Sequence, residues 1–140
     1  MAVAALVSVL GCNGCRKSDA DRVPPVPASA DPEGKDIVPG AIVAAEEKPN
    51  GIRLYKVLEV NWFPDPIGDE LVMIAYSEKG DTYEQCRELW IKHNLTITLP
   101  KARVAKHMFI RREHRIIATE AVSDADKNLK PGDPQPKPSS

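Results

Sequence analysis

The sequence is poor in the residues from which most catalytic and metal sites are built. Its 140 residues include three cysteines and three histidines. Between Ile37 and Ala125 there is neither a Cys-x-x-Cys pair nor a His-Glu-x-x-His motif. No spacing of residues joins a nucleophile to a base. These absences favour a non-catalytic protein that has no metal ion or other cofactor.

The sequence also lacks a long apolar run and a strong net charge. The apolar stretch near the N-terminus, Ala2–Leu10, is too short to cross a bilayer, because a spanning helix takes about 20 residues. The formal net charge is −1, so the chain is nearly neutral. A transmembrane anchor is disfavoured, and so is a nucleic-acid partner unless the protein is cytosolic.

The same N-terminal stretch ends in Val9-Leu10-Gly11-Cys12, a small residue followed by a cysteine. Residues 1–12 resemble the signal peptide of bacterial lipoproteins, in which the cysteine after the cut carries a diacylglycerol. The resemblance implies removal of residues 1–11, acyl chains on Cys12 and an extracytoplasmic location in the cell envelope. The alternative is a buried N-terminal strand or helix of a cytosolic protein.

Two segments are rich in proline and charge and contain few large apolar side chains. They are residues 12–36, predicted to be a disordered linker to the lipid, and residues 126–140, predicted to be a disordered tail. Residues 37–125 remain as one folded domain. Within it, Cys86 is either a small buried hydrophobe or, in an oxidising compartment, a partner for Cys15.

The domain begins with three runs that favour β-strands, followed by one that favours a helix. The strand runs are residues 41–45, 52–60 and 71–76, and Asn50-Gly51 predicts an antiparallel hairpin between the first two. In the second run, Ile52, Leu54, Leu58 and Val60 should share one face. Asp81, as an N-cap, then predicts a helix over residues 82–93 that buries Tyr83, Cys86 and Trp90 and ends at Asn94.

Two further strands are predicted, at residues 95–99 and 116–122, while residues 101–112 suit either a strand or a short helix. The fold class is therefore α+β, a small antiparallel sheet or an SH3-like, partly open barrel with one helix. Pro39-Gly40, Lys56-Val57-Leu58 and the strand Leu71–Tyr76 resemble the opening of small SH3-like and Tudor-like barrels. That resemblance covers residues 39–76 and implies no particular function.

Charge is distributed unevenly along the domain. Residues 37–86 contain four Lys or Arg against nine Asp or Glu, whereas residues 87–115 contain eight against two. One interpretation is that opposite charges pair across the sheet; the other is a basic patch that binds lipid, a polyanion or an acidic partner. The patch would comprise Arg103, Lys106, His107, Arg111, Arg112, His114 and Arg115.

Trp62-Phe63 precedes a loop that contains two prolines. The two rings are either part of the core, as large aromatics usually are, or a surface anchor on a rigid loop. The favoured function is thus a lipid-anchored envelope module that binds an envelope protein or a polyanion. The alternatives are a thiol enzyme using Cys86 with one of the scattered histidines, His93, His107 or His114, and, if the signal interpretation is wrong, a cytosolic SH3-like module that binds protein or nucleic acid.

Overall fold

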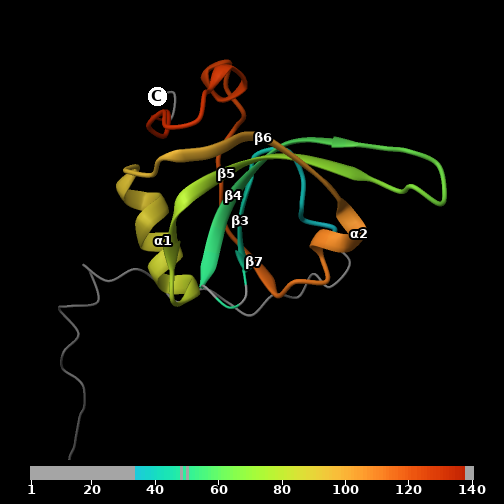
Figure 1. Cartoon of the computed structure of the whole chain (residues 1–140), viewed down its shortest axis with the longest axis horizontal. Helices are drawn as coiled ribbons and strands as arrows, with labels where there is room; N and C mark the ends of the chain where they lie inside the picture. Colours follow the sequence, from blue (N-terminus) through green and yellow to red (C-terminus); the bar gives the residue numbers. More distant parts are fainter. Residues whose placement is uncertain (1–33, 48, 50, 138–140) are drawn as a thin grey trace, which may run out of the picture.

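The computed structural model describes residues 34–47, 49 and 51–137 (Figure 1). The predictions for the signal peptide, for lipid on Cys12, for Cys15 and for most of the linker lie outside the described residues. Gly34 is buried, and its carbonyl oxygen accepts a hydrogen bond from the Ile37 amide at 3.2 Å. The folded domain therefore includes Gly34, three residues before the predicted boundary.

The described residues form a five-stranded antiparallel sheet that does not close on itself. The spatial order is β6-β5-β4-β3-β7, so β6 and β7 are the two edges. The strands are β3 (Ala41–Glu46), β4 (Ile52–Asn61), β5 (Glu70–Gly80), β6 (Ile97–Ala105) and β7 (His114–Thr119). Together with the helix α1 (Tyr83–Lys92), this confirms the predicted α+β fold class.

The β3–β4 hairpin confirms the predicted antiparallel pairing. Gly51 has a φ of 98°, a conformation that costs glycine little, and its carbonyl accepts a hydrogen bond from the Glu47 amide at 2.8 Å. The predicted face of β4 is wrong at one position. Ile52, Leu54 and Leu58 share a core, but Val60 packs on the opposite face because the register shifts between Val57 and Glu59.

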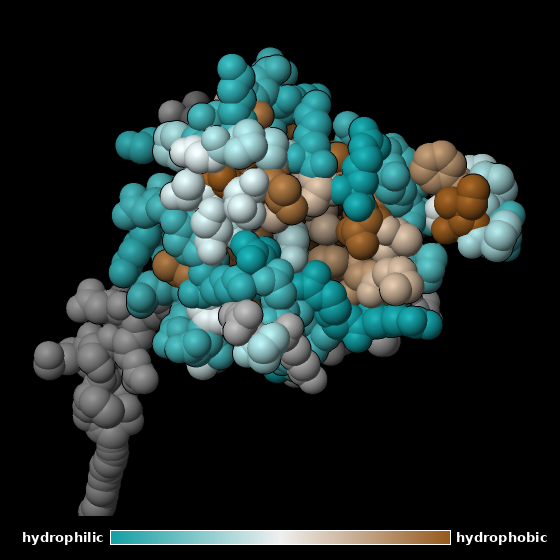
Figure 2. Space-filling view, viewed as in Figure 1, coloured by the Kyte–Doolittle hydropathy of each residue, from teal (hydrophilic) through white to brown (hydrophobic). Residues whose placement is uncertain are grey.

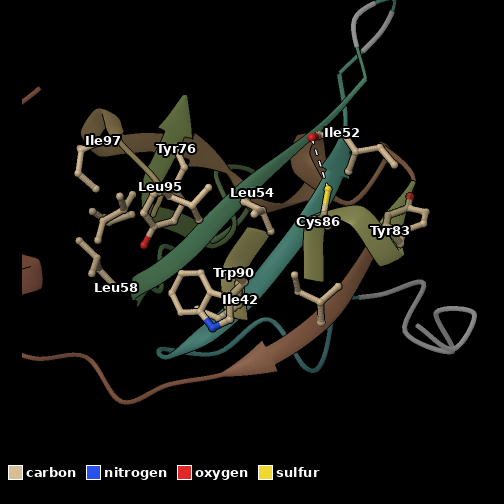
Figure 3. Packing of buried hydrophobic residues seen from close by; sticks show 14 residues of the cluster. Ile42, Ile52, Leu54, Leu58, Tyr76, Tyr83, Cys86, Trp90, Leu95 and Ile97 are labelled. Carbon is tan, nitrogen blue, oxygen red and sulfur yellow. Dashed lines mark hydrogen bonds between the residues drawn. The ribbon is translucent and has the colours of Figure 1, made fainter. Parts of the chain in front are cut away.

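The sheet is buried on both faces. One core, here called the α1-side core, contains Tyr83, Cys86 and Trp90 of α1 packed on the sheet (Figure 3). The other, the α2-side core, contains Phe109 from α2, a one-turn helix at Lys106–Phe109. Alternate residues of β3, β4 and β5 contribute to each core, which explains why these strands contain long runs of buried side chains.

Helix α1 lies where the sequence predicts it, but both of its caps differ by one residue. Thr82, not Asp81, is the N-cap: its hydroxyl accepts a hydrogen bond from the Gln85 amide at 3.1 Å, and the Gln85 side chain accepts one from the Asp81 amide. At the other end His93, not Asn94, takes the left-handed conformation, with a φ of 53°. The predicted buried residues of the helix are confirmed.

The ambiguous residues 101–112 contain both a strand and a helix. Strand β6 runs through Pro100, which an edge strand tolerates, and continues to Ala105. Helix α2 follows directly and places Phe109 in the α2-side core. The last strand, β7, spans residues 114–119 instead of the predicted 116–122.

The predicted disordered tail is wrong over residues 126–137. Asp126 and Gln135 are buried, a 3₁₀ helix, η3, spans Ala125–Asn128, and Pro134 forms a β-bridge with Thr96. In Figure 1 this red segment lies beside β6. The prediction was wrong because it counted apolar side chains, which are few in this segment. Backbone and ionic contacts hold the segment instead.

A substitution at the end of β5 tests how tightly α1 packs on the sheet. A Cβ on Gly80 would lie 2.9 Å from the Cys86 Sγ atom and 3.1 Å from its backbone nitrogen. We expect Gly80→Ala to lower the free energy of unfolding by about 1–3 kcal/mol, measured by urea denaturation. Ser77→Ala, at an exposed site of the same strand, should change it by less than about 0.5 kcal/mol. Equal effects of the two changes would contradict this packing.

Candidate docking site at the hairpin tip

The β4–β5 hairpin projects from the body of the domain, and its tip is residues 62–69 (Figure 1). Three of the large apolar side chains of the tip are exposed to solvent: Trp62 by 76%, Ile67 by 59% and Phe63 by 38%. Figure 2 shows apolar colour at this projecting end. The interpretation that Trp62 and Phe63 belong to the core is wrong, because both rings are exposed. Sequence reasoning missed Ile67, because a lone isoleucine in a loop carries no signal.

Hydrogen bonds hold the tip and its base. Within the tip, the Ile67 amide donates to the Pro64 carbonyl at 3.1 Å. At the base, the Lys106 amide donates to the Asp69 carbonyl at 2.8 Å, and the Asn61 side chain donates to Glu70 at 3.3 Å. These contacts fix the loop that presents the three apolar side chains, so less conformational entropy would be lost on binding.

Part of the predicted basic cluster lies at the base of the same hairpin. Arg103 forms an ion pair with Glu70 at 3.0 Å, and the Lys106 Nζ atom lies 4.0 Å from an Asp69 oxygen. These pairs fit the prediction that the acidic and basic halves of the domain complement each other across the sheet. Arg103 is exposed, and exposed pairs of this kind contribute only about 0–1 kcal/mol each.

Other members of the cluster are structural and lie on opposite faces of the sheet. The Arg112 guanidinium donates to the Glu46 carbonyl at 2.8 Å and to the Tyr55 hydroxyl at 3.2 Å, and lies 5.2 Å from the Phe109 ring. His114 is buried, and one of its ring nitrogens lies 2.9 Å from the Arg112 carbonyl oxygen.

Arg115 points to the other face, where its guanidinium lies 4.3 Å from the centre of the Tyr83 ring on α1. His107 and Arg111 are exposed. The seven residues therefore do not form one continuous basic patch, because Arg112 and Arg115 face different cores.

A cleft of about 600 Å³ is lined by Glu46, Glu47, Arg111, Arg112 and Glu113. The cleft is lined by both acidic and basic side chains, and some of them form ion pairs or hydrogen bonds with other residues of the domain. Hydrogen bonds from Arg53 and Lys79 lower the pKa of Glu47 to about 2, so this carboxylate stays ionised and paired at neutral pH. Of its lining residues, Arg111 alone belongs to the exposed part of the predicted basic cluster.

The thiol of Cys86 has none of the features of a catalytic nucleophile. It is fully buried, it lies 3.6 Å from the Ile52 carbonyl oxygen (Figure 3), and burial raises its pKa to about 11. His93, the residue that caps the C-terminus of the same helix, directs its ring nitrogens to the Ile91 carbonyl and to Glu120. Cys86 thus matches the prediction of a small buried hydrophobe.

The described residues contain neither a metal-binding cluster nor a membrane-spanning helix. No group of three or more His, Cys, Asp or Glu side chains among them is placed to hold a metal ion. None of the helices in this part of the chain is long and apolar enough to cross a bilayer. The chain also matches no protein-family model, no curated protein and no solved structure.

Single substitutions in the basic cluster separate its structural members from its exposed ones. We expect Arg112→Gln to lower the free energy of unfolding by about 1–3 kcal/mol, because it removes charged hydrogen bonds to Glu46 and Tyr55. Arg111→Gln should change it by less than about 0.5 kcal/mol. Thermal and urea unfolding of the two variants provide the measurement, and a neutral Arg112→Gln would show that these contacts do not stabilise the fold.

Proposed function

We propose that this chain is a non-catalytic binding module of the bacterial cell envelope, held by lipid on Cys12, that docks a partner protein through the tip of the β4–β5 hairpin. The observation that carries the docking proposal is the exposure of Trp62, at 76%, on a loop that has an internal hydrogen bond and a second one from α2 at its base. Aromatic side chains presented in this way contribute much of the binding energy at protein interfaces.

Two features make a protein a better partner than a polyanion. The predicted basic residues do not form one surface, because Arg112 and Arg115 contact aromatic rings on opposite faces of the sheet. The tip itself carries Asp65, an exposed carboxylate between two prolines, which would repel a polyanion. A thiol enzyme is disfavoured by the burial of Cys86 and its raised pKa.

The lipid anchor is tested at the cysteine that would carry it. We expect Cys12→Ser to release the full-length protein from the membrane fraction, because each buried methylene of an acyl chain contributes about 0.8 kcal/mol to membrane binding. Cys15→Ser should leave the protein in that fraction. Fractionation of cells followed by mass spectrometry of the mature N-terminus provides the measurement. An unprocessed wild-type protein in the cytosol would refute the anchor.

The docking surface is tested by photo-crosslinking in intact cells, with a photoreactive amino acid in place of Ile67. We expect a discrete protein adduct whose yield falls about tenfold or more with Trp62→Ala, since truncating an anchor residue costs roughly 2 kcal/mol or more of binding. Ile91→Ala, at an exposed site on α1, is the matched control and should leave the yield unchanged.

Thermal stability should be unchanged in both variants, because both side chains are largely exposed. An adduct yield that does not depend on Trp62 would overturn the docking proposal. An adduct with phospholipid alone would assign the tip to the membrane surface.

A further inference from the structure

The C-terminal strap, defined as residues 120–136, follows β7 and closes over the α1-side core. Val122 and Leu129 pack against that core, and η3 contacts β6. In Figure 1 the strap runs back beside β6 after leaving β7. Its first part makes an ionic contact with the rest of the domain, and its last part makes an isolated β-bridge and backbone hydrogen bonds.

The ionic contact is made by Lys56, on the central strand β4. Its side chain is only 1% exposed, and its Nζ atom donates to Asp126 at 2.8 Å, to the Ala121 carbonyl at 3.0 Å and to Glu120 at 3.3 Å. All three acceptors belong to the strap. A buried ammonium without a partner is strongly unfavourable, so whatever covers Lys56 must bring a carboxylate to it.

The backbone contact lies beside the start of β6 and consists of an isolated β-bridge with flanking hydrogen bonds. The Ile97 amide donates to Asp133, the Gly132 amide donates to Ile97, and the Gln135 amide donates to Leu95, each at 2.8 Å between backbone atoms. Thr96 and Pro134 are the bridge partners. This is the pattern by which extended peptides add to the edge of a sheet.

The strap contributes little apolar burial of its own. Val122 and Leu129 are only partly buried, and most of its other residues are exposed. A segment held by one ionic contact and a few backbone bonds opens at lower free energy than a packed strand. The strap is attached through a carboxylate on Lys56 and through backbone hydrogen bonds to residues 95–97. Many other sequences can make both kinds of contact.

One group on the surface under the strap lacks a hydrogen bond: the Tyr76 hydroxyl is fully buried and has no hydrogen-bond partner among the described residues. In the strap itself, the buried Gln135 side-chain nitrogen likewise has no partner in this part of the chain. Tyr76 lies with Leu95 and Ile97 at one end of the α1-side core (Figure 3). A different segment on this surface could make a hydrogen bond to Tyr76 that the strap does not make.

We propose that the surface formed by Lys56, Tyr76 and the edge at residues 95–97 is a binding site for an extended, acidic segment of a partner protein, and that the strap occupies this site in the free chain. The partner segment places a carboxylate on Lys56 and adds a short strand to β6. The segment takes the place of the strap, so Lys56 is paired with a carboxylate both in the free chain and in the complex. This site is separate from the hairpin tip and does not depend on the docking function proposed for it.

The probe is a fluorescent peptide of residues 120–137, added to the full-length protein. In the wild type the strap competes with the peptide, so its apparent affinity is reduced by the small fraction of open chains. Gly132→Ala loosens the strap without touching Lys56, because Gly132 has a φ of 90° and a Cβ there meets no atom within 4 Å. Gly68→Ala is the matched control, with a φ of 72° and an equally open environment in the hairpin tip.

We expect fluorescence anisotropy to show about fivefold tighter binding of the peptide to Gly132→Ala than to the wild type or to Gly68→Ala, because the strain costs the strap on the order of 1 kcal/mol. A peptide with Asp126→Asn should bind about tenfold more weakly, since it cannot form the ion pair with Lys56. Asp126→Asn in the protein is a second way to loosen the strap and should likewise increase binding of the unmodified peptide. Circular dichroism checks that each variant is folded.

Equal binding of the peptide to the Gly132→Ala and Gly68→Ala proteins would overturn the proposal, as would a peptide affinity that does not depend on Asp126. A dimer that forms with increasing protein concentration, and is dissociated by the peptide, would assign the site to a second copy of this chain and overturn the assignment to a partner protein.

Discussion

The structure depends on the charge of Lys56, which lies on the central strand of the sheet and is 1% exposed. An ammonium at that position would be costly in an apolar core, so the chain after β7 must return and supply acceptors. Glu120, Ala121 and Asp126 do so within one short stretch of sequence. The constraint explains why a segment rich in proline and polar residues is ordered, and why η3 begins where it does: the side chain of Asp126 accepts from both Lys56 and the Ser123 amide.

The second constraint is that the middle strands of the sheet are buried on both faces. Helix α1 covers one face, while α2 and Ile37 cover much of the other. The described residues therefore contain two thin cores, and charged side chains pack within them. Arg112 stacks beside Tyr55 and Phe109, and Lys56 is paired with Ile74 across the sheet. Several basic residues that resemble a binding patch in the sequence are consequently part of the packing.

Local patterns predicted the parts of the fold that local physics determines. The first three strands, the β3–β4 hairpin and α1 follow from β-branched runs, from Asn-Gly and from helical spacing, and all are present. The order of the strap did not follow, because composition counts apolar side chains and cannot anticipate one buried lysine 70 residues away in sequence from Asp126. The exposure of Trp62 was also undetermined, since it depends on how far the hairpin extends beyond its neighbours.

That extension is itself a consequence of strand length. Strands β4 and β5 have 10 and 11 residues, whereas β3 has 6. The β3–β4 register ends at Lys56, while β4 continues to Asn61. The outer part of the hairpin therefore lacks β3 on one side, and the loop beyond it has no core in which to bury Trp62 and Ile67. Burial of these side chains would require another molecule, and their exposure adds nothing to the stability of the fold. Selection for stability alone would not favour large apolar side chains at such a site, and the docking function proposed above would give them a role.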